Sequence, residues 1–389
     1  MASTPISKSR LIVAAILAIL VYGMIAAMLG TILPELSRKF SLSVDQNATI
    51  AFAQALGLIL ASVSVGPLVD NKGKKTGLLL GLSLIAASLF ALPSATGFNM
   101  IVGCLFFLGL GGGIIVTAGN ALVSDISEDK RASVLNLLNL FFGLGGLMTP
   151  FIAANLLGGD AFKLCYLTAG LTAATLIVHS TTRMPPPSGE RGFKMEEAGP
   201  VLSDARLWLL ALFLFLYVAC EVGVWNWFVK YQIAQGMNEQ TALNILSLGF
   251  ALGLLLGRVA VSPILIKIPA QVVTMAASVL MLFTTYGMLQ TSDPTLAAVV
   301  VFLGGIAMAP VFPTTLAMVG NTFPRMTATA MGIVITSGWI GLAVSSRIIG
   351  AIAGNDDTQL KTALLVLPGF SLLMILTNLV MLPMLRRRA

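Results

Sequence analysis

The feature that most constrains this chain is a series of long apolar segments that recurs along its whole length. The hydrocarbon core of a bilayer is about 30 Å thick, so a helix needs roughly 20 apolar residues to cross it. Because unpaired backbone amides are costly in lipid, such segments form helices. Twelve segments qualify, at residues 11–33, 48–69, 76–94, 101–124, 132–157, 163–182, 206–229, 241–264, 270–290, 296–319, 327–352 and 361–384. The predicted fold class is therefore an all-α membrane protein with 12 transmembrane helices.

The composition agrees with this class. Apolar residues make up 57% of the chain and charged residues 10%, whereas about a quarter of the residues in a soluble domain are charged. Cys104, Cys165 and Cys220 all lie inside apolar segments, which argues against a disulfide framework. The first apolar segment is too long for a cleavable signal peptide. We expect an integral, multi-pass protein of a lipid bilayer, located in a bacterial inner (plasma) membrane.

The net charge of +7 is explained by the expected topology. Basic residues gather in the cytoplasmic loops of membrane proteins. If both termini are cytoplasmic, most basic residues lie on that side, and the opposite side holds Arg38, Lys39, Lys163, Lys230 and Lys361. We therefore predict that both termini are cytoplasmic, and the charge gives no reason to expect a nucleic acid partner.

One segment interrupts the apolar series between the sixth and seventh spans. It contains three consecutive prolines at residues 185–187, mixed charges and no periodicity of a buried element. This layout predicts two six-helix bundles, at residues 1–182 and 206–389, joined by a cytoplasmic linker at residues 183–205. Two such halves, related by an axis along the membrane normal, are typical of one large group of secondary transporters.

The loop after the second span carries the most specific motif. Residues 66–75 read GPLVDNKGKK and resemble the G-x-x-x-D-R-x-G-R-R/K signature of the major facilitator superfamily, in the loop where that signature belongs. The resemblance implies the major facilitator fold, with Asp70 and Lys74 in a gate between conformations. Asn71 stands where the signature usually has arginine, which weakens the charge relay of that gate. The alternative is a basic loop that only follows the topology.

Shorter matches narrow the resemblance. The runs at residues 30–36, 40–46, 111–120 and 135–143 are similar to spans one, four and five of the fucose-permease-like family of sugar transporters. Gly257-Arg258 and residues 309–313 are similar to its later spans. Residues 143–150, GLGGLMTP, look like a glycine–proline motif associated with antiporters of the superfamily. We do not infer antiport from it, because small residues at helix interfaces usually serve close packing.

The chain departs from the family at two acidic positions. Proton-coupled members carry one acid late in the first span and another in the fourth span. The corresponding positions here hold Gly30, or by a neighbouring alignment Thr31, and Val116. None of these side chains titrates, so we do not expect proton coupling through the family's usual pair.

Glu221 is the acid that the sequence places inside a span, the seventh. An ionisable group at lipid depth is costly unless it faces water or a partner, so Glu221 is predicted to be functional. One helical stripe holds Tyr217, Glu221, Trp225, Phe228 and Gln232. Carboxyl oxygens accept bonds from sugar hydroxyls, and aromatic faces pack on the C–H face of a pyranose. The stripe therefore predicts sugar binding by Tyr217, Glu221 and Trp225. The alternative is a structural carboxylate paired with Lys230, Arg258 or Arg347.

Other polar or aromatic side chains lie at depths suited to a site between the two bundles. They are Gln54 on span two, Asn120 on span four, Asn136 and Asn139 on span five, Asn244 on span eight and Trp339 on span eleven. We predict that they bind the solute, with Asn120 close to the cytoplasmic gate. Each could instead form a helix–helix hydrogen bond, which contributes about 0.6 kcal/mol on average.

Two arginines inside spans are predicted gating residues. Arg258 lies in the inner part of span eight and Arg347 in the outer part of span eleven. Each could bond to a helix end in one conformation only, and neither is expected at the midplane. The alternative is that each side chain extends to the nearer membrane surface.

Nothing in the sequence resembles catalytic machinery, since the chain has one histidine, no phosphate-binding loop and no clustered metal ligands. We therefore expect no enzyme and no cofactor. The predicted function is transport of a small, neutral, polyhydroxylated solute, such as a monosaccharide, by a monomeric protein. Facilitated diffusion and symport with a proton or a sodium ion both remain open.

Three other functions fit parts of the sequence. A proton-coupled exporter of amphipathic drugs would use Glu221 as its proton site and the Met- and Phe-rich spans as an adaptable pocket. An organic anion transporter would need a basic group at the midplane. A sensor built on a transporter fold would bind a solute without moving it.

Overall fold

The computed structural model describes residues 8–126, 131–184, 199, 201–323 and 327–386. Within this part of the chain the regular structure is helical throughout. The first half consists of α1 (Lys8–Phe40), α2 (Val44–Lys72), α3 (Lys74–Ala91), the short η1 (Leu92–Ser94), α4 (Phe98–Ile126), α5 (Arg131–Asn155) and α6 (Ala161–Thr181). Most of the predicted linker lies outside the described residues.

The second half contains more helical pieces because several spans are divided. It consists of α8 (Ala205–Ala234), α9 (Glu239–Asn244), η2 (Ile245–Ala251), α10 (Leu252–Lys267), α11 (Ala270–Gly287), α12 (Pro294–Met308), α13 (Val311–Thr322), α14 (Thr327–Ala353), η3 (Asp357–Gln359), α15 (Leu360–Leu364) and α16 (Val366–Arg386). The tenth span divides between α12 and α13, next to Pro310. Proline has no backbone N–H to continue the helix, which accounts for this break.

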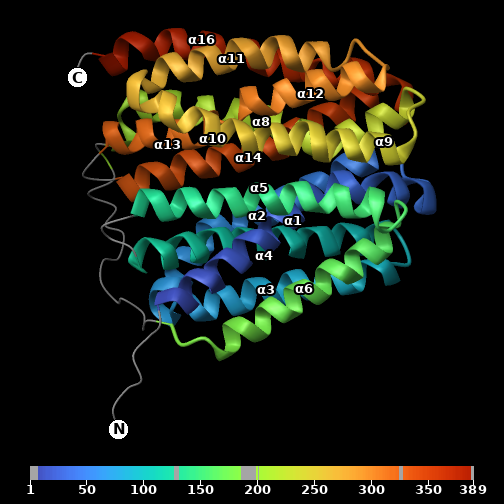
Figure 1. Ribbon diagram of the computed structural model, residues 1–389, viewed down its shortest axis with the longest axis horizontal. Coiled ribbons are helices and arrows are strands. Elements are labelled where there is room, and N and C mark those ends of the chain that lie inside the picture. The colour runs from blue at the N-terminus through green and yellow to red at the C-terminus, as the bar shows by residue number, and fades with distance from the viewer. Residues whose placement is uncertain (1–7, 127–130, 185–198, 200, 324–326, 387–389) are drawn as a thin grey trace.

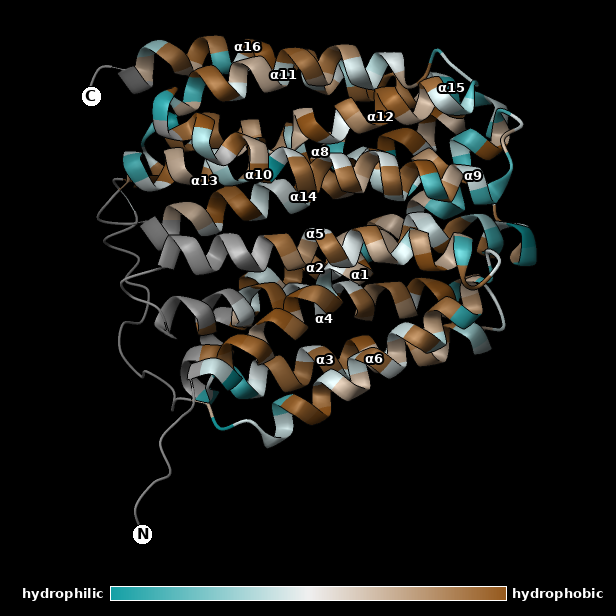
Figure 2. Cartoon of the chain, in the orientation of Figure 1, coloured by the Kyte–Doolittle hydropathy of each residue, from teal (hydrophilic) through white to brown (hydrophobic). Residues whose placement is uncertain are grey.

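The predicted spans are confirmed as helices. Eleven helical segments of the described chain are long and apolar enough to cross a membrane. The remaining span is α5, whose described apolar part runs from Leu140 to Asn155. Figure 2 shows the apolar residues along the middle of the helices and the polar residues toward their two ends, as expected for helices that cross a bilayer.

The helices lie side by side in two layers (Figure 1). In that view α1–α6 form the lower layer and α8–α16 form the upper layer. We call the end of the bundle that holds the start of α1 and the end of α16 the terminal end, and the opposite end the distal end. The α5–α6 loop and α9 lie at the distal end.

Glycines bring α2 and α4 into close contact in the first half. A Cβ on Gly57 would overlap the carbonyl oxygen of Phe106, and a Cβ on Gly109 would overlap that of Gln54. Small residues at helix interfaces let membrane helices approach closely where no hydrophobic force drives them together. This contact fixes the depth of Gln54 in α2.

The second half repeats this contact. A Cβ on Gly253 of α10 would overlap the carbonyl oxygen of Phe302, and a Cβ on Gly305 of α12 would overlap that of Phe250. Gly253 and Gly305 are as far apart in sequence as the two contact glycines of the first half. The halves are therefore structural repeats as well as two sets of six spans.

A second pair of contacts follows the same repeat. In the first half, the Thr149 hydroxyl of α5 donates a hydrogen bond to the Met24 carbonyl of α1 over 3.1 Å. In the second half, the Ser345 hydroxyl of α14 donates to the Ala219 carbonyl of α8 over 2.8 Å. These buried bonds hold the cavity-lining helices of each half in register.

Candidate functional site

A cavity of about 180 Å³ lies between the two halves. Helices α1, α2, α4 and α5 line it from the first half, and α8, α10, α13 and α14 line it from the second. Most of its lining is apolar or aromatic, with a few polar groups, as in most small-molecule sites. The polar and amphipathic groups are Tyr22, Gln54, Glu221, Trp225, Asn226, Arg258 and Trp339.

Glu221 reaches this cavity from the middle of α8 and is partly exposed within it. Two of its predicted structural partners are engaged elsewhere. Lys230 pairs with Asp357, with Nζ and Oδ1 3.0 Å apart, and Arg347 pairs with Asp45 over 3.7 Å. The third predicted partner, Arg258, interacts electrostatically with the Glu221 carboxyl.

Arg258 also lines the cavity, from α10. Its guanidinium interacts electrostatically with Glu221 and lies 5.6 Å from the centre of the Phe142 ring. The sequence predicted a gating role for Arg258, away from the midplane. The structure instead places it in the lining of the same cavity as the acid, with which it interacts.

Aromatic rings enclose the cavity from both halves. The Trp225 ring meets the Phe250 ring edge to face, with ring centres 5.1 Å apart. A Cβ on Gly146 of α5 would contact the Trp225 ring, so a small residue in the first half makes room for it. Trp339 of α14 lines the cavity from the second half.

The distal side of the cavity is closed by polar contacts between the two halves. Arg38 of α1 pairs with Glu239 of α9 over 2.7 Å. The Asn155 amide of α5 donates to the Asn244 side-chain oxygen over 2.6 Å, and Asn244 donates back over 3.3 Å. These bonds join α1 and α5 of the first half to α9 of the second half. They can form only when the two halves are close together at the distal end.

A third distal contact joins α2 to α14. Arg347 donates to the Thr49 hydroxyl over 2.8 Å and lies near Asp45. The Asp45 backbone N–H donates to the Gly354 carbonyl over 3.0 Å. The position of Arg347 supports its predicted role in a gate, on the side opposite to the termini.

Glycine also permits the halves to meet directly. A Cβ on Gly30 of α1 would overlap the Trp225 carbonyl oxygen of α8, and a Cβ on Gly350 of α14 would overlap the side chain of Ala48 on α2. Backbone is therefore packed against backbone between α1 and α8. This contact lies on the distal side of the cavity, so a larger residue at Gly30 would hold that side open.

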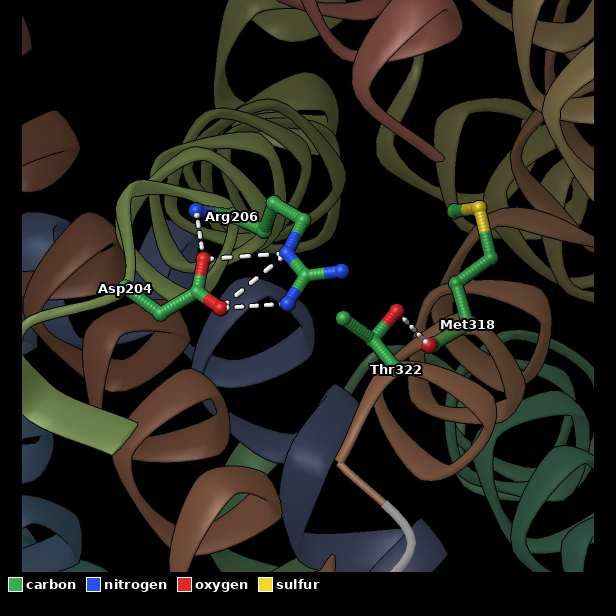
Figure 3. Close-up of polar contacts among 4 residues, drawn as sticks. All are labelled: Asp204, Arg206, Met318 and Thr322. Atoms are coloured by element: carbon green, nitrogen blue, oxygen red, sulfur yellow. Dashed lines mark hydrogen bonds and ion pairs between the residues drawn. The ribbon is translucent and has the colours of Figure 1, made fainter. Parts of the chain in front are cut away.

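At the terminal end the described polar contacts each lie within one half, such as the bond from Lys75 of α3 to the Ser180 carbonyl of α6 over 2.7 Å. Asp204 caps α8 and binds Arg206 through three bonds, the shortest of 2.5 Å (Figure 3). The Arg206 guanidinium extends toward the end of α13, where it lies 5.8 Å from the Phe323 ring. The hydrogen bonds and ion pairs that join a described residue of one half to a described residue of the other lie at the depth of the cavity or on its distal side.

Comparison with known proteins identifies the family. The sequence profile of the Major Facilitator Superfamily matches residues 15–346. The chain belongs to the major facilitator superfamily. It is 25% identical over 356 residues to a glucose/mannose transporter of Bacillus subtilis (strain 168), covering 87% of each chain. It is 27% identical over 235 residues to a glucose/galactose transporter of Brucella abortus, covering 54% of this chain and 55% of that protein.

Solved structures share the fold at low sequence identity. A crystal structure of the nucleoside transporter NupG matches with a TM-score of 0.78 and 14% identity, covering 96% of this chain and 98% of that chain. A D-xylose-proton symporter matches with a TM-score of 0.77 and 14% identity, covering 95% and 97%. The predicted fold is confirmed.

Some of the residues predicted to bind the solute line the cavity, and others do not. Gln54, Glu221, Trp225 and Trp339 line it together. Tyr217 is fully buried behind Glu221 and does not line it. Asn244 does not line it either, because its amide is held by Asn155 in the distal contact. The predictions that Tyr217 and Asn244 face the solute are therefore not matched in this conformation.

Several predicted residues have side chains outside the described part of the structure. They are Asp70, Asn120, Asn136 and Asn139. Their helices are described, and they run along α2, α4 and α5 toward the terminal end. Lys74 begins α3, directly after Gly73, whose φ of 85° suits glycine at the turn from α2.

Sequence reasoning missed two polar groups of the cavity. Tyr22 of α1 lines it, and its ring packs at a tilt against the Phe142 ring, with ring centres 5.2 Å apart. Asn226 of α8 also lines it, next to Trp225. Tyr22 belongs to a helical stripe with Ile19, which could have indicated its orientation. Val116 stands at the fourth-span position where the resemblance led us to look for an acid. It lines the same cavity, so this position adds an apolar side chain to the lining.

Proposed function

We propose that this protein transports a small, neutral, polyhydroxylated solute of the monosaccharide class by alternating access. The observation that carries the proposal is the composition of the cavity between the halves. It combines the acid Glu221 with the donors of Arg258 and the amides of Gln54 and Asn226, beside the rings of Trp225 and Trp339. These are the groups that a sugar ring needs on its edge and on its faces.

Each group has a definite part in recognising such a solute. The carboxyl of Glu221 accepts hydrogen bonds from neighbouring hydroxyls, and an amide such as Gln54 both donates and accepts. A tryptophan ring covers the C–H face of a pyranose without a polar cost. The relatives named as glucose/mannose and glucose/galactose transporters support this class of solute.

The distal contacts define the direction in which this conformation opens. Because ion pairs and backbone packing close the distal side, solute exchange takes place at the terminal end. Basic residues concentrate at that end, so it is assigned to the cytoplasm and the conformation is inward-facing. The cavity is complete within one chain, and the transporter acts as a monomer.

Counterflow in proteoliposomes tests the proposal. Vesicles loaded with unlabelled glucose, mannose, galactose or xylose are diluted into the same labelled sugar, beside protein-free vesicles. Transient accumulation of at least one labelled sugar is expected, and competition by the others should rank them.

Two rival substrates are tested in the same vesicles. A cationic dye represents the drug exporter. Benzoate represents the organic anions. Arg258 in the cavity lining supplies the basic group that an organic anion transporter would need. Exchange of the dye or of benzoate without exchange of any sugar would overturn the proposal, and binding without exchange would favour a sensor.

A further inference from the structure

The two halves contribute different chemistry to the cavity. Among the described lining residues, both charged side chains, Glu221 and Arg258, come from the second half. The first half supplies the Gln54 amide and the Tyr22 ring, and most of its remaining lining is apolar. These apolar residues are Ile19, Ile25, Ala26, Leu58, Val116 and Phe142. The charged groups therefore belong to one half, while the described lining of the other half is mostly apolar.

The structural repeat shows where this difference arises. The glycine contact between α5 and α1 falls on the Leu20 carbonyl, and the corresponding contact between α14 and α8 falls on the Phe215 carbonyl. Ala26 and Glu221 each lie six residues further along their helices. Both line the cavity. The counterpart of the cavity acid in the first half is therefore a single methyl group.

The apolar surface beside Ala26 continues from α1 onto α4. A Cβ on Gly112 of α4 would contact the side chain of Ile25, the neighbour of Ala26, so the two helices pack closely at this depth. Val116 follows Gly112 by about one helical turn, toward the terminal end, and lines the cavity. Ile25, Ala26 and Val116 thus form one apolar surface, which we call the first-half wall.

This wall affects which solutes bind well. Glu221, Arg258 and Gln54 can bond to hydroxyls of a sugar, and the Trp225 and Trp339 rings can cover its C–H face. A hydroxyl placed against the first-half wall would lose its bonds to water without gaining a partner, which lowers affinity. An alkyl group in the same place would bury apolar surface, and each buried methylene raises affinity about fourfold.

We propose that the preferred solute is a monosaccharide that carries a small apolar substituent, such as the alkyl group of a glycoside. The second half binds its hydroxyls, and the first-half wall holds its substituent. Ala26 and Val116 then determine specificity for the substituted sugar over the free one. The inference rests on the proposed transport function and names the substrate class of the same site.

Competition in counterflow tests this preference. The labelled solute is the sugar that exchanges best, and the competitors are that sugar and its methyl and propyl derivatives, substituted at C1 or at C6. At least one propyl derivative should halve the exchange at a concentration about tenfold or more below that of the free sugar, with the methyl derivative between them. The labelled methyl derivative should itself accumulate transiently.

The mirror-image sugar provides a control for effects of the bilayer. Its propyl derivative enters lipid as readily as the derivative of the natural sugar, but the hydroxyls no longer match the polar groups of the cavity. It should therefore compete far more weakly. Equal competition by the two mirror images would show that the alkyl group acts through the lipid, and the inference would fall.

Val116→Thr tests the first-half wall directly. It replaces one methyl of the wall by a hydroxyl that an alkyl group cannot satisfy. The preference for the propyl derivative over the free sugar should fall about fivefold, the effect of about one hydrogen bond. Val299→Thr is the matched control, since Val299 lies exposed on α12 outside the lining, and it should keep the wild-type preference. Ala26→Val narrows the wall and should also lower the preference, so it decides if Val116→Thr fails to fold.

The outcomes separate this inference from the proposed function. If the free sugar exchanges and no derivative competes better, the preference is overturned and the transport proposal stands. A wild-type preference in both Val116→Thr and Ala26→Val would also overturn the inference, because the substituent would not contact the first-half wall. A derivative that competes but does not exchange would be an inhibitor, which contradicts its role as the solute. Absence of exchange by every sugar and every derivative would reject the transport proposal itself.

Discussion

At the scale of the residue, the cavity combines a few polar side chains that differ in what each contributes to binding. Glu221 is partly exposed inside the cavity, where a solute can reach it, whereas Lys230 is buried and paired with Asp357. Charge at lipid depth is tolerated where it has a partner or water. Glu221, the one acid among the described lining residues, therefore lies where a hydroxylated solute would contact it.

Gln54→Ala should weaken sugar binding moderately. The amide offers one neutral hydrogen bond, worth about 1 kcal/mol, so the apparent affinity should fall about fivefold. The concentration dependence of counterflow measures this change. Gln290→Ala, at an exposed position outside the cavity, should leave the affinity within twofold of wild type. An equal loss in both variants would show that Gln54 does not contact the solute.

The sequence indicated Glu221 and Gln54 because each is a polar residue in an apolar span, and it indicated Trp225 and Trp339 as aromatic residues at the depth of a site between the bundles. It could not tell which of such residues face the cavity. Tyr217 shares the stripe of Glu221, but rotation and tilt of α8 bury it. Those two quantities depend on packing against α14 and α16, which no local pattern contains.

At the scale of the element, close helix pairs set the positions of the lining residues. Glycine-rich spans predict close packing, but the partner of each glycine follows only from the fold. Gly103, Gly109 and Gly113 all lie on α4, yet a Cβ on Gly103 would contact nothing, whereas one on Gly109 would overlap the backbone of Gln54. The same residue type thus has different roles along one helix.

Gly109→Ala and Gly103→Ala form a matched pair on α4. The new methyl at Gly109 would push against a carbonyl that cannot rotate away, so we expect destabilisation of about 1–3 kcal/mol. The apparent melting temperature in detergent should fall by several degrees. Gly103→Ala has open space and should stay within about 1 kcal/mol of wild type. Equal melting temperatures would contradict the described α2–α4 contact.

At the scale of the whole molecule, the distal contacts stabilise the conformation in which the distal side of the cavity is closed. Arg38 and Glu239 are 201 positions apart in the chain, so no local pattern could predict their pairing. Only the repeat of two bundles indicated that such contacts between the halves would exist. Their locations on α1, α9, α2 and α14 decide which side of the cavity is closed.

Arg38→Glu should favour opening of the distal side. It replaces an exposed ion pair by two like charges, and such pairs contribute about 0.2–1 kcal/mol, so the equilibrium should shift up to about fivefold. Spin labels at Leu156→Cys and Gln240→Cys, on exposed distal positions of the two halves, report the separation after the native cysteines are replaced by alanine.

The reversed pair supplies the control for this prediction. Arg38→Glu combined with Glu239→Arg should restore the short distance. Lys163→Glu breaks the Lys163–Asp160 pair, which lies at the same end but within one half, and should change nothing. An equal shift in Lys163→Glu would mean that net charge, and not the contact between the halves, controls closure.

The cavity around Glu221 is proposed to bind a neutral polyhydroxylated solute. Equilibrium binding of labelled glucose, mannose, galactose and xylose to purified protein tests this proposal most directly, with Glu221→Leu as the comparison. Saturable binding of at least one sugar by wild type is expected. Because Leu removes every hydrogen bond of the carboxyl, binding should weaken about tenfold or more. Equal sugar affinity in wild type and Glu221→Leu would contradict the account.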